Sequence, residues 1–204
     1  MGGWDTGAVE DEAIGDSDTR ADGLLSTDLI PASGGAWSGL LFDNPRIGLT
    51  PQLTWNFEFR YRDAVRDYGN SPVSMTLDWI PLETSTWSAM TGLTARGTEF
   101  GDRGEASVYF FAHHRYANIE LDLMSQRNVA VNARATVAGD TDGLGIESIT
   151  AEAWLRFAGI RVALSDVRSA DVALSRLQDF TDTVGLSPTP IREHSSFRFV
   201  AEMA

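Results

Sequence analysis

The chain has 204 residues, enough for one domain with a sizeable core, and its 29 acidic and 16 basic residues give a net charge of −13. This charge argues against a nucleic-acid partner unless several arginines cluster on one face. All 16 basic residues are arginine and cysteine is absent, which excludes lysine Schiff bases, phosphate-loop lysines, thiol nucleophiles and thiolate zinc sites.

Residues 1–28 carry eight acidic side chains against one arginine, which is more than half of the net charge. Such a segment buries too little apolar surface to offset the entropy of ordering it. We therefore predict an extended N-terminal arm over residues 1–38, flexible or docked, and a single β-sandwich domain over residues 39–204. The bulky apolar residues along the arm are candidates for docking into a neighbouring surface: Trp4, Leu24, Leu25, Leu29, Ile30 and Trp37. Alternatively, the arm is disordered and only its last residues pack on their own domain.

The acidic N-terminus lacks the apolar stretch of a signal peptide, and no apolar run reaches the length of a membrane span. We therefore expect no association with a membrane. The expected location is the cytoplasm, or a particle such as a virion that is assembled there.

Residues 53–61 alternate apolar and polar side chains without exception, which predicts a strand with one face in the core and one face in water. The wet face of this strand is expected to be accessible to a partner through three charged residues: Glu58, Arg60 and Arg62. Residues 73–79 repeat the alternation. Trp79 and Trp87 are therefore expected to join the aromatic residues of the first strand in the core.

Further period-2 segments follow along the chain at 106–112, 117–123, 129–137, 147–157 and from Phe197 onward. Gly159 is expected to mark a bulge or bend. Helical spacing appears once, over about residues 169–184, where Ser169 can cap the start and Gly185 stops the helix. The chain is therefore predicted to be mainly β, an antiparallel β-sandwich or flattened barrel of about nine strands with one helix.

Two motifs are candidates for chemical sites. His113 and His114 are adjacent on a strand and point to opposite faces, so they cannot chelate one ion together. Residues 140–143 (Asp-Thr-Asp-Gly) resemble the start of a calcium loop, but Leu144 and Ala151 stand where oxygen ligands are required. The segment is therefore interpreted as a hairpin turn. We predict no catalytic residue, no cofactor and no metal site.

The first functional hypothesis is a non-enzymatic structural or assembly subunit that self-associates through its arm and its sheet edges. A sandwich of this size with one flanking helix and an extended arm resembles the subunits of phage tail tubes and related virion proteins. The resemblance lies in the architecture, because no residue motif carries it. It implies a homo-oligomer, or binding to other assembly proteins.

Two alternatives remain. The acidic chain is also typical of an immunity or inhibitor module that neutralises a basic protein partner, because complementary charge speeds association. The second alternative is a small-ligand binder or hydrolase that uses His113 or His114 with a nearby carboxylate.

Overall fold

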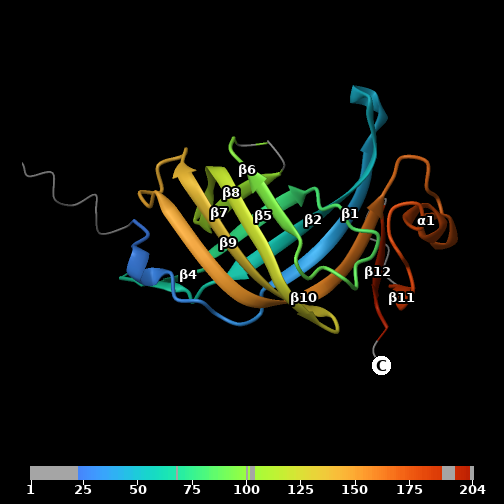
Figure 1. The fold of residues 1–204 in the computed structure, drawn as a ribbon. Helices are drawn as coiled ribbons and strands as arrows, with labels where there is room; N and C mark the ends of the chain where they lie inside the picture. The colour runs from blue at the N-terminus through green and yellow to red at the C-terminus, as the bar shows by residue number, and fades with distance from the viewer. Residues whose placement is uncertain (1–22, 68, 100, 102–103, 190–195, 203–204) are drawn as a thin grey trace, which may run out of the picture.

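The computed structural model describes residues 23–67, 69–99, 101, 104–189 and 196–202, and strands make up most of it (Figure 1). The strands are β1 (Ala36–Asn44), β2 (Leu49–Arg60), β3 (Ala64–Arg66), β4 (Gly69–Ser71), β5 (Ser74–Ile80), β6 (Thr94–Gly97), β7 (Glu105–Phe110), β8 (Ala112–Arg127), β9 (Ala130–Asp140), β10 (Ser148–Ala163), β11 (Leu186–Pro188) and β12 (Phe197–Ala201). The helical elements are two 3-10 turns, η1 (Ser26–Asp28) and η2 (Pro45–Ile47), and the helix α1 (Ala170–Leu177).

Seven strands form a closed ring in the order β1, β2, β5, β7, β8, β9 and β10. Each neighbouring pair is antiparallel except the last, in which β10 runs parallel to β1. Six antiparallel steps return the seventh strand to the direction of the first, so the closing pair must be parallel. The predicted mainly β, largely antiparallel fold is therefore confirmed, and the ring is a flattened barrel. Closure removes the open edges that a sandwich would present within this ring.

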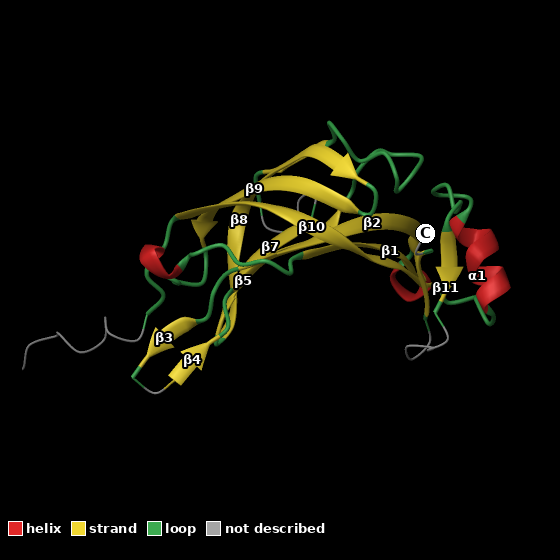
Figure 2. Cartoon of the chain, turned by 90° about the horizontal axis from the view of Figure 1, so that it is seen from below, coloured by secondary structure: helices red, strands yellow, loops and turns green. Residues whose placement is uncertain are grey.

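The remaining strands are attached to the ring or stand beside it. β12 pairs with the second half of β10 and carries β11 on its other side, while β6 pairs with β8. β3 and β4 form a separate hairpin at the end of the barrel where the described chain begins (Figure 2). β12 therefore extends the outer face that β1, β2, β5 and β10 form.

The core follows from the alternation of β2. Trp55, Phe57 and Phe59 are at most 1% exposed, and Trp87 joins the same core. Gly39 makes room for this packing, because a Cβ atom at position 39 would lie 3.1 Å from side-chain atoms of both Trp55 and Ile160. The predicted strand at residues 53–61 and the predicted place of Trp87 are thus confirmed.

The prediction that Trp79 lies in the core is wrong. A bulge in β5 puts one extra residue between the partners of Trp55 and Phe57, so Ile80 faces the core instead. Trp79 has a φ of 58° and its side chain is 44% exposed. An inserted residue changes the phase of the alternation, which a period-2 pattern cannot show in advance.

Helix α1 is shorter than predicted. It begins after Ser169, whose side chain accepts a hydrogen bond from the backbone N–H of Val172, and it ends at Leu177 rather than near residue 184. Beyond it the chain turns to pair with the segment before Trp87, where the backbone N–H of Asp182 donates to the carbonyl of Ser85. This pairing draws residues 178–184 away from helical geometry. Across the ranges that are described, no helix combines the length and the apolar character needed to cross a membrane.

Candidate functional site

Two clefts lie side by side on the outer face of β1 and β2. The larger, which we call the apolar cleft, has a volume of about 560 Å³, and its apolar lining residues are Phe42, Ile47, Leu49, Trp79 and Pro81. The smaller, which we call the polar cleft, has a volume of about 360 Å³. Its lining includes six polar or charged side chains: Asn56, Glu58, Thr76, Asp78, Arg161 and Arg198. The clefts adjoin where Leu40 of β1 pairs with Thr54 of β2.

Trp79 owes its place in the apolar cleft to a specific contact with β2. The side-chain Oδ1 of Asn56 accepts a hydrogen bond of 2.8 Å from the backbone N–H of Trp79. This bond holds the bulged residue in the left-handed region, which a bulky aromatic residue rarely adopts. Ile47, at the tip of the β1–β2 hairpin, is 76% exposed and lines the same cleft. Two large apolar side chains are therefore held in water beside an apolar hollow.

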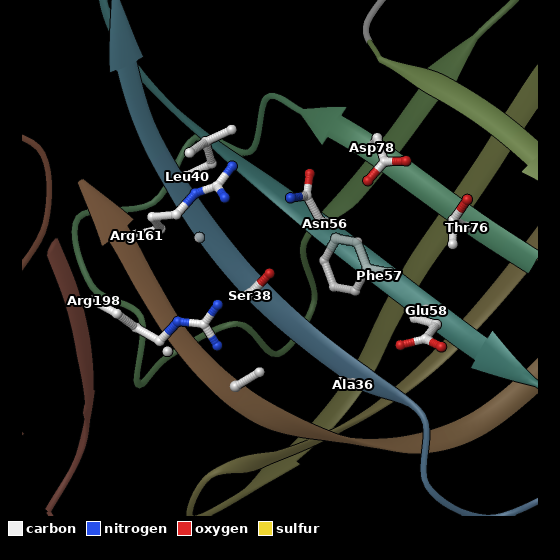
Figure 3. Close-up of a pocket in the computed structure, with 13 residues that line it drawn as sticks. Ala36, Ser38, Leu40, Asn56, Phe57, Glu58, Thr76, Asp78, Arg161 and Arg198 are labelled. Atoms are coloured by element: carbon white, nitrogen blue, oxygen red, sulfur yellow. The ribbon is translucent and has the colours of Figure 1, made fainter. Parts of the chain in front are cut away.

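One wall of the polar cleft is positively charged. Arg161 of β10 and Arg198 of β12 are direct cross-strand partners, and both guanidinium groups lie on the same side of the cleft (Figure 3). The bulge that Gly159 was predicted to mark is confirmed, because the pairing of β10 with β1 shifts register there. Gly159 has a φ of 107°, and a Cβ atom at this position would lie 2.5 Å from the carbonyl oxygen of Phe199. Glycine is thus required for β12 to lie close enough to bring Arg198 beside Arg161.

The other wall of the polar cleft is negatively charged. Asp78 of β5 and Glu58 of β2 line the polar cleft, and Glu105 of β7, which lines the apolar cleft, is the direct cross-strand partner of Asp78. Burial raises the pKa of Asp78, and the charge of Glu58 adds to this effect while His113 opposes it. Burial also raises the pKa of Glu105, with a further contribution from Asp78 and an opposing one from Arg115. Like charges on neighbouring, partly buried positions are typical of functional sites.

His113 stands next to this acidic wall and His114 does not. The ring Nδ1 of His113 lies 3.1 Å from the Ser107 hydroxyl, which in turn lies 3.0 Å from the Thr76 hydroxyl. His114 faces the other side of the sheet, where its Nε2 lies 3.2 Å from the carbonyl of Phe110. The opposite orientations of the two histidines agree with the strand alternation.

The surroundings of His113 do not form a hydrolytic triad or a metal centre. Among the described residues, no carboxylate is hydrogen-bonded to its ring to orient it. Within the same ranges, no group of three His, Asp or Glu side chains converges so as to hold a metal ion.

Residues 140–143 form the predicted turn, which joins β9 to β10. The Asp140 carboxylate accepts hydrogen bonds of 2.9 and 2.7 Å from the backbone N–H groups of Gly143 and Gly145. Asp142 binds the Arg115 guanidinium at 2.7 and 2.8 Å, and this contact lowers the pKa of Asp142 to about 2. The carboxylates of this turn are engaged with the chain itself, as the interpretation as a hairpin turn requires.

The residues predicted to dock along the arm lie in different environments. Leu24 and Trp37 are buried, Leu29 packs partly on the core, Leu25 and Ile30 are about half exposed, and Trp4 lies outside the described residues. An ion pair of 2.6 Å between Asp28 and Arg66, whose side chains are 17% and 9% exposed, fastens the start of the described chain to β3. The described part of the segment predicted as an arm therefore packs on its own barrel.

The three charged residues predicted to be accessible on β2 and just after it also lie in different environments. Glu58 lines the polar cleft and is held by Arg60 at 2.9 Å, while Arg62 is exposed. Sequence reasoning missed Asp78, Arg161 and Arg198 as members of the same site. Each sits at an outward position of its strand, but only the pairing of distant strands brings them to one cleft.

No protein-family model matches this chain, and no match to it is found among the curated proteins or the solved structures. Any functional conclusion must therefore come from the two clefts themselves.

Proposed function

We propose that the protein is a non-enzymatic assembly subunit whose copies bind one another at the apolar cleft. Trp79 is the observation that carries this proposal. A tryptophan in the left-handed region costs roughly 1–3 kcal/mol of backbone strain, yet the bulge exposes it to water instead of burying it. Exposed tryptophans beside a hollow are the usual anchors of protein interfaces. A partner that buries Trp79 on binding would offset the free-energy cost of this strain.

A second copy of the chain fits this surface because each copy offers both halves of the contact. Ile47 and Trp79 project from the face, and the hollow beside them can receive the same side chains from a copy related by a two-fold axis. The sequence suggested self-association through sheet edges, but the closed ring leaves few strand edges open. The proposed contact therefore uses a face of the sheet rather than an edge.

The salt dependence of association separates this proposal from binding to a basic protein. Two copies that each carry a charge of −13 repel one another, so self-association should strengthen as salt screens the repulsion. Binding to a basic partner should weaken under the same change. Sedimentation of the full chain in about 0.05 M and about 0.5 M NaCl measures the sign directly.

The decisive variant is Trp79→Asn, because asparagine tolerates the left-handed region and the fold should survive. We expect the dissociation constant of self-association to rise at least about thirtyfold, which corresponds to the loss of one interface anchor. Sedimentation of the wild type and the variant over a range of protein concentrations gives both constants.

Trp154→Asn is the matched control. Trp154 is 41% exposed on β10, where Arg127 lies over its ring at 5.0 Å, and it is not part of either cleft. This variant should associate like the wild type. A wild-type chain that stays monomeric at high concentration, or equal behaviour of the two tryptophan variants, would contradict the proposal.

A further inference from the structure

The arginine wall of the polar cleft is an arrangement that strand pairing alone does not favour. Arg161 and Arg198 stand directly opposite one another, and like charges in this relation destabilise a sheet. Over the described ranges, no acidic side chain forms an ion pair with Arg161. Two adjacent guanidinium forks match the oxygens of a carboxylate or a phosphate. An anionic group bound to Arg161 would reduce this repulsion, and Arg198 lines the same cleft beside it.

The facing wall is negatively charged and would attract a cationic group. Asp78 of β5 and Glu58 of β2, whose Oε1 also accepts from Arg60, offer carboxylate oxygens, and Figure 3 shows them across the cleft from the two arginines. A plain anion that reached the arginines would meet these carboxylates as well. An ammonium group is the natural partner of such a wall, because it donates up to three charge-assisted hydrogen bonds.

We propose that the polar cleft binds a small dipolar molecule, with its anionic end on Arg161 and Arg198 and its cationic end on Glu58 and Asp78. An amino acid, an ω-amino acid or a similar zwitterion is the chemical class. The hydroxyl of Ser38 and the amide of Asn56 lie between the two walls and can bond its uncharged middle. The volume of about 360 Å³ is within the usual range for small-molecule sites.

This site does not depend on the proposed self-association. The polar and apolar clefts share a border at Leu40 and Thr54, but Trp79 lines only the apolar one. A monomeric Trp79→Asn variant should therefore bind the dipolar ligand as the wild type does, so the two proposals can fail separately.

Three probes of equal chain length test the dipolar requirement: ε-aminocaproate, caproate and hexylamine. They carry both charges, the negative charge alone and the positive charge alone. Isothermal titration of the full chain should show ε-aminocaproate, or the shorter γ-aminobutyrate if the charged walls require a smaller span, binding at least about tenfold more tightly than either single-charge probe. If neither ω-amino acid binds, or if caproate or hexylamine alone binds as tightly, the proposal is overturned.

Two variants with the same change of charge locate the site. Arg161→Ala should weaken the binding of the ω-amino acid at least about tenfold, because it removes a charge-assisted contact. Arg134→Ala removes an exposed arginine from β9, outside both clefts, and should leave the affinity unchanged. Equal affinities for Arg161→Ala and the wild type would overturn the assignment to this cleft. Thermal unfolding of each variant confirms that a loss of binding is not a loss of fold.

Discussion

Opposite charges face one another on the outer surface of β8, β9 and β10, whereas like charges face one another around the polar cleft. On the first surface, Arg134 stands between Asp122 on β8 and Glu152 on β10. Around the cleft, Arg161 stands opposite Arg198, and Asp78 stands opposite Glu105. The same barrel therefore follows the rule of complementary cross-strand pairs on one side and breaks it on the other.

The backbone shows a weaker form of this contrast. The pairing of β9 with β10 runs without a register shift over its whole length, although β8 shifts register against β9 between Leu123 and Ser125, and β5 and the second half of β10 each carry a bulge on the cleft side. Trp79, on the cleft side, has a positive φ, whereas Trp154, on the opposite-charge surface, does not. The strained Trp79 and the like-charge pairs occur together on the cleft side, and departures from local rules from which folding alone gains nothing indicate a functional face. The following changes test this contrast, from the largest expected effect to the smallest.

Asn56→Ala should disturb the cleft side most. It removes the acceptor for the backbone N–H of Trp79, and we expect a loss of about 1 kcal/mol in the free energy of unfolding together with weaker self-association. Asn56→Asp keeps the acceptor and should restore most of both. Asn132→Ala, beside Trp154 on the opposite-charge surface, should cost less than Asn56→Ala. Urea unfolding of the three variants measures the differences, and equal costs for the two alanine variants would contradict the role given to Asn56.

Charge reversals should have opposite signs on the two surfaces. Glu152→Arg places a like charge opposite Arg134 and should lower the free energy of unfolding by about 0.5 kcal/mol. Arg161→Glu creates an opposite-charge pair with Arg198 and should raise it by a few tenths, about 0.3 kcal/mol. Chemical denaturation at low salt resolves both values. The contrast fails if the two reversals change stability in the same direction.

Glu105→Gln should give the smallest effect, and its pH dependence follows from the raised pKa values of Asp78 and Glu105. A carboxyl whose pKa is raised by folding destabilises the folded state when it is ionised, so the wild type loses stability as pH rises through the raised values. Removing the Glu105 charge should therefore stabilise the chain slightly at about pH 7 and have no effect at about pH 3, where both carboxyls are protonated. Melting temperatures at the two pH values check this, and a difference that persists in acid would contradict it.

The alternation along β2 predicted the aromatic core and the outward position of Glu58 correctly, because facing is a property of each strand alone. The same reasoning placed His113 and His114 on opposite sides of the sheet. It failed at Trp79, where a bulge changes the phase between Leu77 and Ile80. The bulge depends on the fit of β5 to β2, which no local pattern contains.

The sequence by itself determined which side chains point inward and which point outward, since the two-residue period of a strand is local. Only the tertiary structure decided which outward side chains meet. Arg161 and Arg198 are brought together by the pairing of β10 with β12, and Glu58 and Asp78 by the pairing of β2 with β5. Closure of the ring by β1 and β10 then places both pairs around one cleft. Register and closure arise from contacts between distant segments, so the site that they create cannot be seen in a single strand.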